Sequence, residues 1–167
     1  MKNNIVLIGM PGAGKSTIGV VLAKTLGMQF VDTDLTIQNE YDATLQKIIQ
    51  KYGDDGFRKI ENDVISKVNV SKTVIATGGS AVYGNEAMEH LKESATIVYL
   101  ELSEKNIESR LGDLAARGIT MKSGQTLEDL YTERVPLYKK YADITINCDG
   151  KNIQQSIELC IKLLTKE

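Results

Sequence analysis

The chain has 167 residues, of which 42% are hydrophobic and 25% are charged. These proportions exclude a wholly disordered chain and a fibrous repeat, and the length predicts one domain over residues 1–167. The 20 basic residues nearly balance the 22 acidic ones, at a formal charge of -2, so we expect no nucleic-acid partner.

Two further features bear on the environment of the protein. Cys148 and Cys160 are too few and too far apart for a zinc knuckle or a redox CxxC motif, so we expect reduced structural thiols. No apolar stretch approaches the roughly 18 residues that a membrane span needs, and the apolar N-terminal run leads into glycines instead of a cleavage site. We expect a cytoplasmic monomer with no membrane partner.

Strands and helices alternate along the predicted chain. β-branched apolar runs favour strands, and apolar residues at helical spacing favour helices. In chain order, the predicted elements are a strand at 4–8, a helix at 16–24, a strand at 29–31, helices at 35–40, 45–53 and 57–68, a strand at 73–77, a helix at 85–92, a strand at 95–100, a helix at 103–110, a helix at 126–141, a strand at 143–147 and a helix at 153–164. This alternation indicates an α/β fold, in which helices cover both faces of a central parallel sheet.

The segment at 112–125 interrupts this pattern. It is polar, holds three glycines and lacks clear periodicity, and a loop of this length in a small domain is usually functional or disordered. Thr126 follows as the predicted N-cap of the next helix, with Asp129 three residues on as a weak capping box. We therefore predict a lid at about 112–125.

The N-terminal loop carries the strongest motif. Residues 9–16 read GMPGAGKS and match G-x-x-x-x-G-K-[ST] at every fixed position, after a predicted strand and before a predicted helix. Glycines let the backbone point successive N–H groups inward, and the helix N-terminus adds positive potential. Lys15 would contact the β- and γ-phosphates, and Ser16 would ligate Mg²⁺. The loop predicts binding of a nucleoside polyphosphate.

Two carboxylates follow the second strand. Asp32 and Asp34 lie at its carboxyl end, the sheet edge at which open α/β folds bind ligands. Alternate residues of an extended segment face the same side, so both carboxylates can point into one site. One can serve the hydration shell of Mg²⁺ while the other accepts a hydrogen bond from a substrate hydroxyl. The alternative is an N-cap pair for the next helix.

Arginines and a glycine turn extend the candidate site. Arg58 can bind a carboxylate through two parallel hydrogen bonds, or it can pair on the surface with Glu61 at i+3. The turn Gly78-Gly79-Ser80 allows close approach of a ligand to the backbone, or it is a plain turn. Arg110, Arg117 and Arg134 come from the second half, and an arginine on a closing loop can neutralise charge on a transferring phosphoryl group.

From about residue 5 to 164 the chain resembles the shikimate kinase family. The resemblance rests on motifs in a fixed order, namely GMPGAGKS at 9–16, DTD at 32–34, FRKIE at 57–61, the two glycines at 78–79, the arginine-bearing loop near Arg117 and ERVPLY at 133–138. It implies a nucleoside-monophosphate-kinase-like fold with a lid and a substrate-binding segment at about 34–61. It also implies ATP-dependent phosphorylation of the 3-hydroxyl of shikimate, in aromatic amino-acid biosynthesis.

The resemblance also implies roles for individual residues. Asp34 would bind substrate hydroxyls and act as the base, while Arg117 and Lys15 would serve the transferring phosphoryl group. Nucleotide-binding residues would be Gly12, Ala13, Gly14, Lys15, Ser16, Thr17 and, beside the adenine, Arg110. Substrate-binding residues would be Asp34, Arg58, Gly78, Gly79, Ser80 and Arg134. Mg²⁺ would be held by Ser16 and Asp32.

Two positions depart from the family pattern. The family usually has a third glycine where this chain has Ser80, which adds bulk and a hydroxyl where the substrate ring would approach. Its lid arginine is usually followed by proline and leucines, whereas Arg117 is followed by Gly-Ile-Thr-Met. A kinase for another hydroxylated acid, such as gluconate, is therefore the alternative. A nucleotide-binding regulatory module is a third hypothesis.

Overall fold

The computed structural model describes residues 2–112 and 118–166. Within these residues five parallel strands form one sheet in the order β2-β3-β1-β4-β5. The strands are β1 (Asn4–Ile8), β2 (Gln29–Asp32), β3 (Thr73–Ala76), β4 (Ala95–Glu101) and β5 (Ile144–Asn147). β1 is buried along its whole length, because it lies at the centre of the sheet with β3 and β4 on either side.

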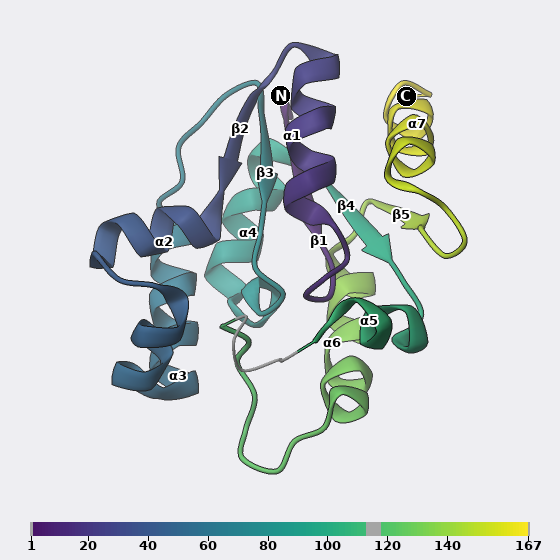
Figure 1. Ribbon diagram of the computed structural model, residues 1–167. Coiled ribbons are helices and arrows are strands. Elements are labelled where there is room, and N and C mark those ends of the chain that lie inside the picture. The colour runs from purple at the N-terminus through teal and green to yellow at the C-terminus, as the bar shows by residue number, and fades with distance from the viewer. Residues whose placement is uncertain (1, 113–117, 167) are drawn as a thin grey trace.

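Helices cover both faces of the sheet, which confirms the predicted three-layer α/β fold (Figure 1). The helices are α1 (Lys15–Leu26), α2 (Thr33–Tyr41), α3 (Leu45–Ser66), α4 (Asn85–Ser94), α5 (Glu104–Arg110), α6 (Leu127–Tyr141) and α7 (Ile153–Leu164). Figure 1 shows α1 in front of the sheet and α4 behind it, and α7 packs against α1 and β5. No helix in the described part of the chain is long and apolar enough to cross a membrane.

Most element boundaries agree with the sequence prediction within two residues, and the differences have local causes. α2 begins at Thr33, because Asp32 caps it through a hydrogen bond from the backbone N–H of Asp34. The helical segments predicted at 45–53 and 57–68 are one element, α3, which is interrupted at Gly53 with φ 72° and ψ 175°. A short 3₁₀ turn, η1 (Ala81–Tyr83), was not predicted.

Capping of α6 and the state of the cysteines follow the sequence prediction. Thr126 and Asp129 form a reciprocal capping box, in which each side chain accepts a hydrogen bond from the other residue's backbone N–H. Cys148 and Cys160 are buried and form no disulfide. α6 therefore begins at a defined residue, and this helix carries the exposed Glu133 and the buried Arg134.

Candidate functional site

The site lies at the carboxyl ends of β1 and β3. The connections that leave these two parallel strands run toward opposite edges of the sheet, because β1 is followed by β2 on one side and β3 is followed by β4 on the other. Such a reversal opens a crevice at the sheet edge, where α/β folds bind ligands. The loop at 9–16 follows β1 and the Gly78-Gly79-Ser80 turn follows β3, so both predicted motifs border the same crevice.

A cavity of about 490 Å³ occupies this crevice. Its lining comes from the N-terminal loop, α2, α3, the β3–η1 turn, the described part of the lid and α6. The charged and polar side chains in the lining include Lys15, Ser16, Asp34, Glu61, Ser80, Thr120 and Arg134. The cavity therefore brings together most of the residues that the sequence analysis singled out, including those of the phosphate loop and Arg134.

The N-terminal loop has the backbone shape of a phosphate cradle. Gly14 has φ 94°, a left-handed value that favours glycine, and α1 begins at the next residue. Lys15 is buried, and its Nζ donates to the carbonyls of Gly9 at 2.7 Å and Met10 at 2.8 Å. Burial lowers the pKa of Lys15 to about 8. The loop thus holds its cation in place and fits a polyphosphate, which would meet free N–H groups and an ammonium.

Ser16 and Asp32 meet beside this loop. The Ser16 hydroxyl donates to Asp32 Oδ2 at 2.6 Å, while Asp32 Oδ1 caps α2. Asp32 therefore fulfils the N-cap alternative and contacts the predicted Mg²⁺ ligand as well. A hydroxyl and a carboxylate are the hard oxygen donors that Mg²⁺ prefers, so this pair fits the ion. The described residues contain no group of three or more His, Cys, Asp or Glu that could hold a metal alone.

Asp34 is the carboxylate that lines the cavity. Burial raises the pKa of its carboxyl group to about 6, and the charge of Asp32 adds to this effect. A carboxylate with such a pKa is ionised at neutral pH and can accept a proton from a bound hydroxyl. Its position in the first turn of α2 places it in the cavity with the phosphate-loop residues, whereas Asp32 is not in the lining. The alternation argument does not apply to this pair, because Asp34 is helical and not extended.

Glu61 is a second buried acid, and the sequence analysis did not place it in the site. Its exposed fraction is 1%, and a Cβ added at Gly78 would lie 2.7 Å from both Glu61 Oε2 and Asp34 Oδ1. A side chain at position 78 would therefore displace both carboxylates. Burial raises the pKa of Glu61 to about 7. The available signal was its position on α3, because Phe57, Glu61 and Ile65 follow at i, i+4 and i+8 on the buried face.

Ser80 lines the cavity, but its hydroxyl is used within the protein. Ser80 Oγ donates to Glu61 Oε1 at 2.5 Å, and only 6% of the residue is exposed. The neighbouring Gly79 carbonyl accepts a hydrogen bond from the buried hydroxyl of Tyr138 at 2.6 Å. The turn after β3 is thus fixed from α3 on one side and from α6 on the other.

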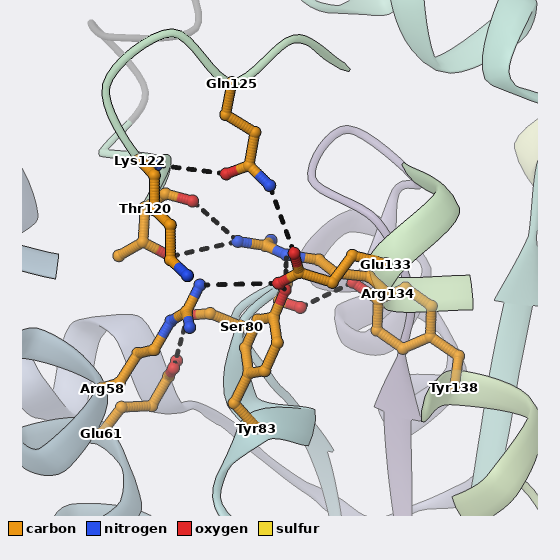
Figure 2. A network of polar contacts seen from close by, with 11 residues as sticks. Arg58, Glu61, Ser80, Tyr83, Thr120, Lys122, Gln125, Glu133, Arg134 and Tyr138 are labelled. Atoms are coloured by element: carbon orange, nitrogen blue, oxygen red, sulfur yellow. Dashed lines mark hydrogen bonds and ion pairs between the residues drawn. The ribbon is translucent and has the colours of Figure 1, made fainter. Parts of the chain in front are cut away.

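Arg134 and Arg58 approach the same region from α6 and α3 (Figure 2). Arg134 is 1% exposed, and its Nη2 donates to the backbone carbonyl of Thr120 at 2.9 Å and to its hydroxyl at 3.1 Å. The Arg58 guanidinium lies 3.8 Å from the centre of the Tyr83 ring, and its Nη2 is 4.0 Å from Glu133 Oε1. Arg58 therefore contacts Tyr83 and Glu133, not Glu61 as the surface alternative supposed.

Tyr83 and Glu133 link the two arginines to the lid. The Tyr83 hydroxyl donates to Glu133 and accepts a hydrogen bond from Arg134 Nε at 3.4 Å. Gln125 of the lid donates to Glu133 Oε2 at 3.3 Å. None of Tyr83, Glu133 and Gln125 was predicted as a site residue. Glu133 begins the ERVPLY motif, but only Arg134 of that motif was given a role, and Tyr83 and Gln125 belong to no motif.

The remaining predicted residues differ in how far they can be placed. Arg110 Nη1 donates to the carbonyl of Gly12 at 3.2 Å, which holds the end of α5 against the phosphate loop. Arg117 lies outside the described residues, so its predicted role stays a prediction. His90, the one histidine of the sequence, lies outside the lining of the cavity, and its Nε2 is 2.6 Å from the carbonyl of Val68.

The parallel sheet and the glycine loop between β1 and α1 define the class of P-loop nucleotide-binding proteins, and comparisons with known proteins narrow this class to kinases. The model of the family described as shikimate kinase matches residues 11–165. A shikimate kinase from Francisella philomiragia is 36% identical over 168 residues, which cover 98% of this chain and 96% of the relative. The chain therefore belongs to the shikimate kinase family of ATP-dependent kinases.

Solved structures separate the family from the wider class. Shikimate kinase from Acinetobacter baumannii in complex with shikimate has a TM-score of 0.85 and 29% identity, and covers 99% of this chain and 94% of its own. A gluconokinase from Sinorhizobium meliloti has a TM-score of 0.60 and 16% identity, with 99% and 94% covered. The second likeness shows the shared fold alone.

Proposed function

We propose that the protein transfers the terminal phosphoryl group of ATP to the 3-hydroxyl of shikimate and releases shikimate 3-phosphate and ADP. One observation carries this proposal: a single cavity joins a phosphate loop, the half-buried carboxylate of Asp34 and the buried guanidinium of Arg134. Shikimate is a hydroxylated carboxylic acid, so its hydroxyls and its carboxylate match the last two groups in kind. Membership of the shikimate kinase family supports the same acceptor.

Asp34 is the proposed base. It accepts the proton of the 3-hydroxyl as that oxygen bonds to the terminal phosphorus, and the bond from this phosphorus to the bridging oxygen breaks as ADP leaves. Burial keeps the pKa of Asp34 near 6, which leaves it ionised at neutral pH yet basic enough to receive a proton. Arg58 and Arg134 would bind the carboxylate of the acceptor, and Gly78, Gly79 and Ser80 would border its ring.

The loop residues serve the nucleotide in this proposal. Lys15 neutralises charge on the transferred group, and the backbone of residues 12–17 would hold the phosphates. Arg110 would lie beside the adenine, and Arg117 would act from the lid. Ser16 and Asp32 would hold Mg²⁺, which supplies a counter-charge to the phosphates when it is bound. We further propose that the chain acts as a cytoplasmic monomer without nucleic acid.

The test is an ADP-release assay with Mg²⁺ and ATP, run without an acceptor and then with shikimate, with gluconate and with other hydroxy acids. We expect shikimate to raise ADP release at least a hundredfold above the rate without an acceptor, and gluconate to leave that rate unchanged. Stimulation by gluconate instead would favour the alternative acceptor. Hydrolysis that no acid stimulates would favour the regulatory module.

A further inference from the structure

Ser80 occupies the position at which the chain departs from the three-glycine turn of its family. A serine at this turn adds a hydroxyl, and the structure shows where that hydroxyl goes. Ser80 Oγ donates to Glu61 Oε1 at 2.5 Å, between the turn after β3 and the buried face of α3 (Figure 2). A glycine has no group that could make this bond, so the contact is specific to chains with a hydroxyl here.

The partner of Ser80 is the buried carboxyl group of Glu61, which has few hydrogen-bond donors around it. Glu61 is 1% exposed, and Ser80 provides the one hydrogen bond that its side chain receives from the described residues. Its Oε2 has no hydrogen-bond partner among them. A buried ionised carboxylate is costly unless it is hydrogen-bonded or faces opposite charge. The ionisation of Glu61 therefore depends strongly on this single hydroxyl.

Charged groups from four helices face Glu61. The cations are Lys15 on α1, Arg58 on α3 and Arg134 on α6, and the anion is Asp34 on α2. Tyr138 on α6 is a further titratable neighbour. None of the cations lies within ion-pair distance of Glu61, so its carboxylate acts on them across space and not through a direct contact.

We propose that Ser80 is a positioning residue, whose hydroxyl favours the ionised form of Glu61 beside the two arginines that would bind the carboxylate of the acceptor. The inference rests on the proposed function for its effect on the acceptor, but not for its effect on Glu61. An ionised Glu61 offsets part of the positive charge of Arg58 and Arg134. Protonation of Glu61 removes this offset and changes how strongly the site attracts an anionic acceptor.

The structure defines the direction in which loss of the Ser80 hydroxyl changes the pKa of Glu61. Burial raises the pKa of Glu61 to about 7, and the hydrogen bond from Ser80 opposes that rise because it stabilises the ionised form. Loss of the hydroxyl must therefore raise the pKa further. In Ser80→Ala we expect the pKa of Glu61 to increase by about 1 pH unit. Ser80→Thr keeps the hydroxyl, so we expect the pKa of Glu61 to equal that of the unchanged protein.

The first measurement is a titration of Glu61 in the folded protein, by NMR of ¹³C-labelled glutamate carboxyl groups, with Glu61→Gln to assign the signal. The titration midpoint should move upward in Ser80→Ala and stay in place in Ser80→Thr. Ser80→Gly serves as a second variant without the hydroxyl. Equal midpoints in all of these proteins would overturn the inference and leave Ser80 with a packing role only.

The second measurement is the pH dependence of KM for shikimate. Its midpoint should move upward in Ser80→Ala by the same amount as the NMR midpoint, and Ser80→Thr should restore it. A KM profile that does not follow the NMR midpoint would contradict the proposed link from Glu61 to the arginines. The NMR titration needs no acceptor. If the protein failed to use shikimate, the proposed function would be overturned, but the NMR titration would still show whether the Ser80 hydroxyl changes the pKa of Glu61.

Discussion

At the scale of single residues, Asp34 and Glu61 are the two acids of the cavity, and their surroundings give them different partners. Glu61 receives a hydrogen bond from Ser80, whereas Asp34 lies beside the phosphate loop and next to Asp32. The position of Asp34 beside the phosphate loop favours it as the proposed base, because the proton is released where the phosphoryl group is transferred.

Asp34→Asn removes the proposed base and keeps the shape of the side chain. We expect kcat with shikimate to fall 10²- to 10⁴-fold, the usual contribution of general-base catalysis. The KM for ATP should stay within about twofold, because the loop at 9–16 is intact. ADP-release kinetics measure both constants. A kcat within a factor of two of the unchanged protein would remove Asp34 from the mechanism.

Glu61→Gln tests the cost of the buried charge. The pKa of Glu61 is raised from an ordinary 4.5 to about 7, so the stabilisation from its neutral form is present below pH 4.5 and is lost as pH rises through 7. The free energy of unfolding should therefore fall by about 2–3 kcal/mol more in the unchanged protein than in Glu61→Gln between pH 4 and pH 8. Urea unfolding at both pH values measures this, and parallel pH dependences would contradict a buried ionisable Glu61.

At the scale of elements, the turn after β3 depends on the absence of a side chain at Gly78. A methyl group there would lie 2.7 Å from oxygens of Asp34 and Glu61, closer than normal contact. In Gly78→Ala we expect KM for shikimate to rise at least tenfold, because both carboxylates must move, while the dissociation constant for ATP changes little. Acceptor kinetics and nucleotide titration separate the two effects. Equal loss of ATP binding would instead indicate general unfolding of the site.

Capping boxes at the starts of α6 and α7 provide a matched pair of tests. Thr126 and Asn152 each accept a hydrogen bond from the backbone N–H of the third helical residue. Replacing either by alanine removes one such bond and should lower the free energy of unfolding by about 1 kcal/mol, as measured by urea unfolding. A loss below about 0.3 kcal/mol in either variant would show that its cap is dispensable.

Local sequence patterns made most helices and strands predictable, whereas contacts between residues far apart in the sequence limited the prediction of the site. The phosphate loop and the carboxylates after β2 depend on short spacings along the chain, so the sequence predicted their shared edge. The bond from Ser80 to Glu61 joins residues 19 apart, and that from Arg134 to Thr120 joins residues 14 apart. Such pairs form only when helices pack. The partners of Arg58, namely Tyr83 and Glu133, were missed for the same reason.

At the scale of the whole molecule, the described part of the predicted lid contacts α6 and α3 beside the cavity. Thr120 and Gln125 of the lid reach Arg134 and Glu133 of α6, and Gly118 lies against Leu45 at the start of α3. The sheet positions the phosphate loop, while α3 and α6 carry Arg58 and Arg134, the proposed ligands of the acceptor carboxylate.

The position of the phosphate group on the product tests this description most directly. The enzyme, ATP and shikimate would be incubated with Mg²⁺, and the product examined by two-dimensional ³¹P–¹H NMR. We predict one new phosphate ester, coupled to the proton on carbon 3 of shikimate, and far less of this ester from Asp34→Asn in the same incubation time. A phosphate on another hydroxyl, or phosphorylation of gluconate but not shikimate, would contradict the proposed arrangement of acceptor, base and arginines.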